Sequence, residues 1–176
     1  MSARNLATKP AEAEDTATFE RFCLAMRELA GGVCVVTSGR GDMRTGLTAT
    51  SVTSLSAEPP SLLVCIHRAS SMLEALRETG AFAVNMLAHD QQAIADRFAG
   101  RCGRFGAERY DGAQWRELST GSSILTGALA NLDCRVEQIT EWHTHAIVVG
   151  SVEAIAEPGG NAPLVYWRGG YSTFAT

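Results

Sequence analysis

The sequence predicts a mainly β protein, a closed or half-closed β-barrel with short helices at the ends of its strands. Three observations support this fold class. Strand-like runs recur along most of the 176 residues, only short helical patterns separate them, and no linker or internal repeat interrupts the series. A parallel doubly wound sheet would instead alternate strands with longer helices. We expect one domain over residues 16–176, preceded by a disordered tail over residues 1–15.

The first segments are assigned from periodicity and composition. Residues 16–29 have the spacing of an amphipathic helix, because apolar side chains recur every three or four positions and Gly31-Gly32 follows. Residues 33–37 form a β-branched run, which indicates a strand. The Thr and Val residues within 44–55 also favour a strand, and Pro59-Pro60 marks a stop after it.

The later segments alternate buried strands with short helices. Residues 61–66 are a continuous apolar run, which predicts a central strand buried on both faces. Ser70 or Ser71 can then N-cap a helix that Gly80 closes. The remaining expected elements are a strand at 81–87, a helix at 89–98, a Gly/Arg-rich loop at 100–114, and strands at 128–139, 145–156 and 164–167.

Composition excludes several classes of protein. A net charge of −4 offers no basic face for nucleic acid. No apolar run approaches the roughly 20 residues that span a bilayer, and the N-terminus lacks the apolar stretch of a signal peptide. We therefore expect a cytoplasmic protein. The five cysteines are odd in number and form no C-x-x-C pair, so reduced thiols are expected.

Two segments could bind a ligand. Residues 46–56 carry small hydroxyl side chains, which would let a planar ligand approach the backbone and bond its polar edge. A solvated Thr/Ser face on an edge strand would have the same composition. Residues 65–71 run from a strand into a helix N-terminus, where amides, hydroxyls and Arg68 could bind an anion. A capped surface helix with a solvated arginine is the alternative.

Other catalytic patterns are missing. No G-x-G-x-x-G follows a strand, so a nicotinamide nucleotide would not bind through a Rossmann fingerprint. No G-x-S-x-G nucleophile motif occurs. His143 and His145 supply only two candidate metal ligands on one strand, so no metal site is expected.

Taken together, the segments resemble the flavin reductase-like family, whose fold is the FMN-binding split barrel, mainly antiparallel and of Greek-key type. The similarity runs from about Phe19 to Tyr171. It is carried by segments in matching order and spacing: Gly46-Leu47-Thr48-Ala49-Thr50, Ser54, Pro59-Pro60-Ser61-Leu62, Val64-Cys65-Ile66, Ala83-Val84-Asn85, Phe98-Ala99-Gly100, Glu108-Arg109-Tyr110, Trp115, Thr144-His145, Gly150 and Leu164-Val165-Tyr166.

The resemblance implies an NAD(P)H-dependent flavin reductase. Such an enzyme passes hydride from NADH or NADPH to FMN or FAD and supplies reduced flavin to a partner monooxygenase. The resemblance also implies a homodimer. Two alternatives remain open: a flavin-dependent reductase of another acceptor, such as a cobalt corrinoid, and a non-catalytic flavin-binding protein. An oxidase of the pyridoxal-phosphate type would need a more basic phosphate pocket.

The resemblance further implies roles for single residues. His145 would lie near the nicotinamide and flavin rings as the catalytic residue, and Arg168 or Tyr171 would close one side of the site. Thr48, Ala49, Thr50 and Ser51 would follow the isoalloxazine edge and the ribityl chain. The ribityl and phosphate groups would be held by Ser54, Ser56, Cys65, Ile66, His67, Arg68, Ser70 and Ser71. His67-Arg68 and Gly169 depart from the usual family pattern, which leaves the choice between FMN and FAD open.

Overall fold

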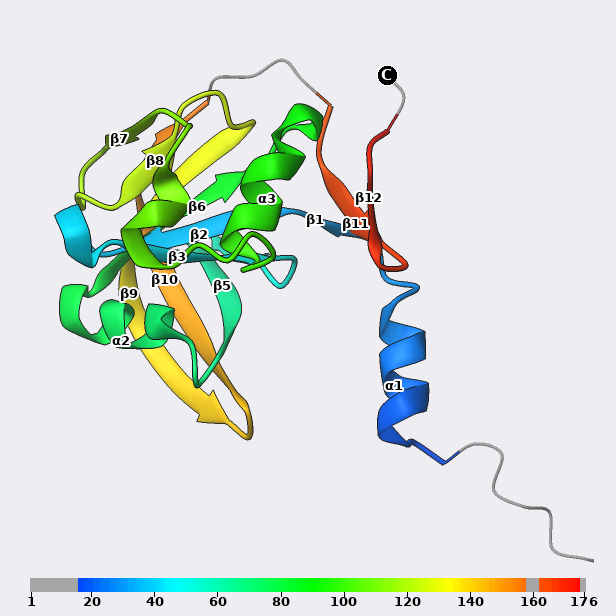
Figure 1. Cartoon of the computed structure of the whole chain (residues 1–176). Helices are drawn as coiled ribbons and strands as arrows, with labels where there is room; N and C mark the ends of the chain where they lie inside the picture. Colours follow the sequence, from blue (N-terminus) through cyan, green and yellow to red (C-terminus); the bar gives the residue numbers. More distant parts are fainter. Residues whose placement is uncertain (1–15, 158–161, 175–176) are drawn as a thin grey trace, which may run out of the picture.

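The protein is built on a seven-stranded sheet in which every hydrogen-bonded pair is antiparallel (Figure 1). The computed structural model describes residues 16–157 and 162–174; the expected N-terminal tail lies outside them. The strand order is β3-β2-β6-β9-β10-β5-β4. The strands are β2 Cys34–Ser38, β3 Thr45–Ala49, β4 Thr53–Ala57, β5 Pro60–His67, β6 Ala81–Met86, β9 Ala130–Trp142 and β10 His145–Ala156. The expected mainly antiparallel architecture is confirmed.

Two small sheets flank the large one. The hairpin of β7 (Trp115–Glu117) and β8 (Ser123–Leu125) lies beside β6. The other small sheet joins β1 (Gly31–Gly32) to β11 (Val165–Trp167) and β12 (Gly170–Ser172). With α1 (Phe19–Met26) it forms an arm that projects from the body (Figure 1). Strands β7, β8 and β12 were not predicted, because three-residue strands are too short to show periodicity.

Helix α2 (Ser71–Thr79) covers one face of the sheet. The Ser70 hydroxyl accepts a hydrogen bond from the Met72 amide at 3.3 Å, and Gly80 ends the helix in a left-handed conformation with φ of 63°. Met72, Leu73 and Leu76 pack into a cluster with inward side chains of β2, β5, β6, β9 and β10. The predicted helix and both of its caps are confirmed.

The opposite face is covered by short helical segments. These are η2 (His89–Gln91), α3 (Gln92–Phe98) and η3 (Gly106–Tyr110). Phe98 packs directly against the β3 backbone, since a side chain at Gly46 would come within 2.7 Å of its ring. Phe98, Tyr110 and Leu125 form the centre of a second apolar cluster. A further 3-10 turn, η1 (Gly41–Met43), connects β2 to β3.

Two sequence predictions about the strands were wrong. Residues 44–55 do not form one strand: β3 ends at Ala49 and β4 begins at Thr53. The expected burial of 61–66 on both faces is also wrong. Leu62, Val64 and Ile66 are in the core, whereas the alternate residues are only half-buried. The reason is topological, because β5 lies next to the edge strand β4 rather than in the centre of the sheet.

The two edges of the sheet are β3 and β4, which follow each other in the chain. They form no ladder with each other in residues 16–157 and 162–174, so the sheet is not closed by hydrogen bonds. Among these residues, no helix is long and apolar enough to cross a membrane.

Candidate functional site

A cavity of about 200 Å³ lies at the end of the edge strand β3. Thr48, Ala49 and Thr50 form one wall of the cavity. Arg101, Tyr166 and Tyr171 line it from the loop after α3 and from the β11–β12 hairpin. The structure thus brings three predicted ligand residues together with the predicted Tyr171. Arg101 was not predicted as a site residue; its only signal was the Gly/Arg-rich composition of its loop.

The far wall of this cavity combines aromatic rings with a positive charge. The Tyr166 and Tyr171 rings meet edge to face, with centroids 5.3 Å apart, and the Arg101 guanidinium lies 5.5 Å from the Tyr171 ring. Burial is the main cause that raises the pKa of Tyr171, and a hydrogen bond to Tyr166 raises that of Arg101. The cavity therefore presents a guanidinium and two aromatic rings, which suit a planar ligand with electron-rich edges.

Half of the hydroxyls of the predicted tract already have partners within the protein, namely those of Thr48, Ser51 and Ser56. Thr48 donates to the Ala95 carbonyl at 2.6 Å, which fastens β3 to α3. Ser51 donates to the Cys65 carbonyl at 3.0 Å and accepts from the Cys65 amide at 3.3 Å, which fastens the link after β3 to β5. Thr50 is exposed and its hydroxyl has no protein partner in the described part of the chain. Thr50 is therefore the threonine of this cavity whose hydroxyl is available to a ligand.

The segment between β5 and α2 offers fewer free donors than its sequence suggested. The amides of Arg68, Ala69, Ser70, Met72 and Leu73 all donate to protein acceptors. The Arg68 side chain forms a 2.6 Å ion pair with Glu141 and donates to the His143 carbonyl. The Ser71 hydroxyl shares a 3.1 Å hydrogen bond with the Thr45 hydroxyl on β3. An anion bound here would therefore depend on side chains more than on amides.

The two predicted histidines lie side by side on neighbouring strands. His67 and His145 are paired across β5 and β10, and their ring centroids are 5.1 Å apart at an angle of 80°. His67 Nδ1 accepts from the Ala69 amide, so a neutral His67 carries its proton on Nε2. His145 Nδ1 shares a 2.9 Å hydrogen bond with the Thr144 hydroxyl. Both rings are exposed and available to a ligand.

The other predicted residues lie away from these groups. Ser54 and Ser56 line a separate, mainly apolar groove of about 440 Å³ beside β4. The Ile66 side chain is buried in the core, so this residue could contact a ligand only through its main chain. Arg168 projects from a turn and binds the Glu28 carboxylate, with a shortest N–O distance of 2.6 Å. The described residues contain no cluster of three or more metal-ligating side chains.

The sequence comparisons agree with this arrangement. A family model described as "Flavin reductase like domain" matches residues 26–175. The chain belongs to the flavin reductase-like family. This match confirms the resemblance and the predicted class of enzyme, a nicotinamide-dependent flavin reductase.

Individual relatives of this flavin reductase are named as flavin reductases or as a reductase subunit. An FMN reductase (NADH) RutF 2 from Methylorubrum extorquens is 43% identical over 142 residues, which is 81% of each chain. The reductase subunit HsaB of a flavin-dependent monooxygenase from Rhodococcus jostii is 33% identical over 86% of this chain and 76% of its own. The solved structure of the NADH:FAD oxidoreductase SgcE6 from Streptomyces globisporus superposes with a TM-score of 0.84, 29% identity, and coverage of 96% and 100%.

Proposed function

We propose that this flavin reductase passes hydride from NADH to FMN or FAD bound along the open edge of β3. The observation that carries this proposal is the cavity in which Thr50 faces Arg101, Tyr166 and Tyr171. Its residues fit a flavin, because they supply a free hydroxyl, aromatic walls and one cation around the cavity. The names of the related NADH-dependent flavin reductases support the choice of both nucleotides.

Each side chain would act by binding and positioning. A bound flavin supplies the hydride-accepting chemistry itself. Thr50 would orient the polar edge of the ring, Tyr166 and Tyr171 would limit access of water, and Arg101 would stabilise developing negative charge. His145 would contact the nicotinamide, with its ring oriented by Thr144. No side chain is required as a nucleophile in this scheme.

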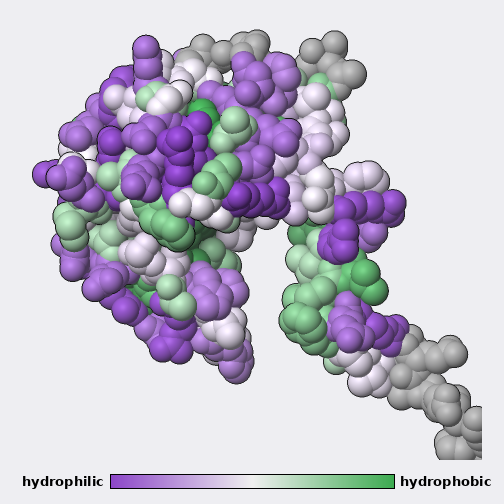
Figure 2. Space-filling view, viewed as in Figure 1, coloured by the Kyte–Doolittle hydropathy of each residue, from purple (hydrophilic) through white to green (hydrophobic). Residues whose placement is uncertain are grey.

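The assembly would be a homodimer that shields the arm. The apolar side chains of α1 and its continuation are exposed in the single chain: Phe19, Phe22, Leu24, Met26 and Leu29. They form a green patch on the arm in Figure 2. The mainly apolar groove beside β4 is a second uncovered apolar surface. Contiguous apolar surfaces of this kind are typical of subunit interfaces, and a second copy would bury them.

The finer fold would be the split barrel of the family, formed by one domain over residues 16–176. Its support is the short link between the two edge strands: residues 50–52 join β3 to β4, and Ser51 bonds to Cys65 of β5. A Greek-key barrel with a gap between the edge strands β3 and β4 would place the flavin in that gap. We propose a cytoplasmic location, since reduced flavin and NADH meet there.

The reduced flavin would pass to a larger monooxygenase component. This partner is proposed because the relative HsaB is named as a reductase subunit of such an enzyme. The alternative function is a flavin carrier without activity. Such a protein would bind flavin but would not oxidise NADH or NADPH. A cobalt corrinoid would be the acceptor only if the protein reduced it faster than free reduced flavin does.

A steady-state assay tests the proposed function. Oxidation of NADH and NADPH is followed with FMN, FAD and riboflavin as acceptors. We expect saturable oxidation of NADH that depends on added flavin nucleotide. Flavin binding without nicotinamide oxidation would support the flavin carrier. If the protein neither binds flavin nor oxidises the nicotinamide, both proposals are contradicted.

A further inference from the structure

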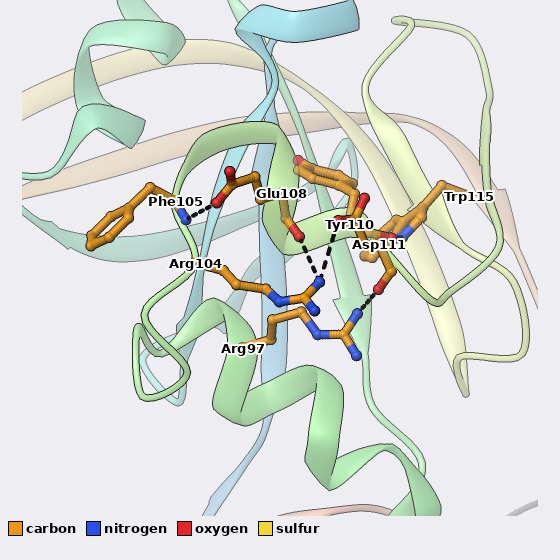
Figure 3. A network of polar contacts seen from close by, with 7 residues as sticks. All are labelled: Arg97, Arg104, Phe105, Glu108, Tyr110, Asp111 and Trp115. Carbon is orange, nitrogen blue, oxygen red and sulfur yellow. Dashed lines mark hydrogen bonds and ion pairs between the residues drawn. The ribbon is translucent and has the colours of Figure 1, made fainter.

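The cavity at the end of β3 has two walls that the fold holds in different ways. Arg101 comes from the loop after α3, and polar contacts brace that loop against α3 (Figure 3). Arg97 of α3 and Arg104 of the loop both reach Asp111. The same loop leads into η3, whose Tyr110 is buried in the second apolar cluster. This wall is therefore fixed to the body of the protein.

The other wall, made by two tyrosines, comes from the β11–β12 hairpin of the projecting arm (Figure 1). Tyr166 and Tyr171 are paired directly across this hairpin. On its other side Tyr166 is paired with Gly31 of β1, a strand of only two residues. Such a short strand supplies few hydrogen bonds, so the position of the two rings depends on further contacts within the arm.

Those contacts join the tip of the hairpin to the chain just after α1. Nε and Nη2 of Arg168 donate to the Glu28 carboxylate at 2.6–3.0 Å. The Arg168 amide donates to the Arg27 carbonyl at 3.2 Å, and Arg27 Nη2 donates to the Arg168 carbonyl at 2.9 Å. The Trp167 indole donates to the Glu28 carbonyl at 3.3 Å. We call this set of contacts, between residues 27–28 and 167–168, the clamp.

The backbone of the hairpin turn also depends on the clamp. Arg168 and Gly169 have φ of 50° and 89°, the positive values that a tight two-residue hairpin turn requires. A side chain is disfavoured in this conformation, so the contacts that Arg168 makes with Glu28 help to keep the turn in place. The Arg168 guanidinium also lies 4.4 Å from the centroid of the Trp167 ring, a cation–π distance.

Arg168 itself stands outside the cavity. Tyr166 and Tyr171, on either side of the turn, line the cavity, whereas Arg168 does not. Both carboxylate oxygens of Glu28 accept from Arg168, so the charge of this guanidinium is already balanced. The resemblance implied that Arg168 closes the site directly. In this geometry it can affect a ligand only through the position of the hairpin.

The clamp is strong enough to order a hairpin and too exposed to support the core. The side chains of Arg168 and Glu28 are 57% and 55% exposed. An isolated ion pair at such a position contributes little, but a bidentate contact that belongs to a network contributes more. Loss of the pair should therefore loosen the tyrosine wall and leave the seven-stranded sheet folded.

We propose that Glu28 and Arg168 are positioning residues that hold Tyr166 and Tyr171 at the flavin cavity. Neither of their side chains contacts the flavin. The segment after α1 thereby helps to set the affinity for flavin, although it lies outside the cavity. This inference rests on the proposed flavin reductase function and adds the residues that order one wall of its site.

The test breaks the pair from each side in the full chain. The variants are Glu28→Gln, Arg168→Met, both together, and Arg168→Lys. Glu153→Gln is the matched control, because it removes a carboxylate from another exposed ion pair, with Arg135 on the large sheet. Fluorescence titration gives the FMN dissociation constant, steady-state kinetics give the KM for FMN and for NADH, and thermal unfolding gives the melting temperature.

We expect Glu28→Gln and Arg168→Met each to raise the FMN dissociation constant and the KM for FMN about threefold to fivefold. The double variant should lose no more than either single variant, because both substitutions break the same contact. Arg168→Lys keeps the charge without the bidentate contact and should have a smaller effect. The KM for NADH and the melting temperature should change little, and Glu153→Gln should match the wild type.

Weaker FMN binding in Arg168→Met with none in Glu28→Gln would mean that Arg168 contacts the flavin directly, and would overturn the positioning role. Unchanged binding in both variants, or additive losses in the double variant, would overturn it as well. A wild-type chain that neither binds flavin nor oxidises NADH would instead contradict the proposed function, so the two failures are distinguished.

Discussion

The centre of the large sheet and its β3 edge use polar groups in opposite ways. In the centre, Asn85 of β6 is fully buried, and both the nitrogen and the oxygen of its side-chain amide have protein partners. Its Nδ2 donates to the Val35 carbonyl, and its Oδ1 accepts from the Leu125 amide and from Asn131 Nδ2, at 2.7–2.9 Å. At the edge, the Thr50 hydroxyl has no protein partner in the described residues.

This difference separates residues that build the fold from residues that can bind a ligand. A buried polar group that is fully bonded rigidifies the structure, and its loss leaves several partners unpaired. A polar group that stays unpaired at an open edge contributes no hydrogen bond to the fold and is available to a ligand. The two neighbouring serines also differ, because the Ser70 hydroxyl accepts from an amide of α2 whereas the Ser71 hydroxyl shares a hydrogen bond with Thr45 of β3.

The largest effect is expected from Asn85→Ala. The substitution leaves one buried carbonyl and two buried N–H groups without their partner, so the free energy of unfolding should fall by about 3 kcal/mol or more. Chemical denaturation measures it, with Thr50→Val as the control that should change stability little. Equal free energies of unfolding for the two variants would contradict the distinction between the centre and the edge of the sheet.

The adjacent serines sharpen the comparison. Ser70→Ala removes the N-cap of α2 and should lower stability by about 1 kcal/mol, with little effect on flavin affinity. Ser71→Ala should leave stability unchanged and raise the FMN dissociation constant about tenfold, since one hydroxyl contact to phosphate is lost. Chemical denaturation and fluorescence titration of both variants measure these effects. A loss of FMN affinity in Ser70→Ala together with a loss of stability in Ser71→Ala would contradict the prediction.

A smaller effect is expected at the histidine pair. His145→Ala should raise the KM for NADH about threefold to tenfold, because an exposed ring gives at most a modest binding contact, while FMN affinity stays constant. Steady-state kinetics at saturating FMN measure it. Unchanged kinetics would remove His145 from the site.

The smallest effect at neutral pH concerns the buried thiols. Burial raises the pKa of Cys34 and of Cys134 from the ordinary 9.0 to about 12. Both stay protonated, so thiol reagents should modify exposed Cys102 first. The unfolded thiols ionise near pH 9, whereas the folded thiols stay protonated there. Their contribution to the free energy of unfolding is therefore retained below pH 9 and lost as the pH rises toward 12. Rapid labelling of Cys34 in the folded protein would contradict this.

Local signals predicted the elements that obey local rules. Ser70 and Gly80 define both ends of α2, and most strands follow from their β-branched and apolar runs, whereas their antiparallel order was implied by the family resemblance. Residues 50–52 show where such signals fail: Thr and Ser are compatible with a strand, yet the chain leaves β3 there and enters β4 on the opposite edge of the sheet. Only the Ser51–Cys65 contact reveals the break, and its partners are 14 residues apart.

The site was predicted only in part for the same reason. Thr48, Ala49, Thr50 and Tyr171 do meet around one cavity. Arg101 was missed because nothing in its immediate sequence distinguishes it from other exposed arginines. Its role depends on Tyr166 and Tyr171, which the fold brings to it from distant positions.

The most direct test of the central claim is the rate of NADH oxidation with FMN in a Thr50→Trp variant. Thr50 is exposed at the cavity of about 200 Å³, so the indole should occupy the proposed flavin space without disturbing the core. Thr126→Trp, on the exposed loop before β9, is the control. We predict a loss of kcat/KM greater than about tenfold at an unchanged melting temperature, with the control unaffected. Full activity of Thr50→Trp would mean that the flavin does not bind at the β3 edge.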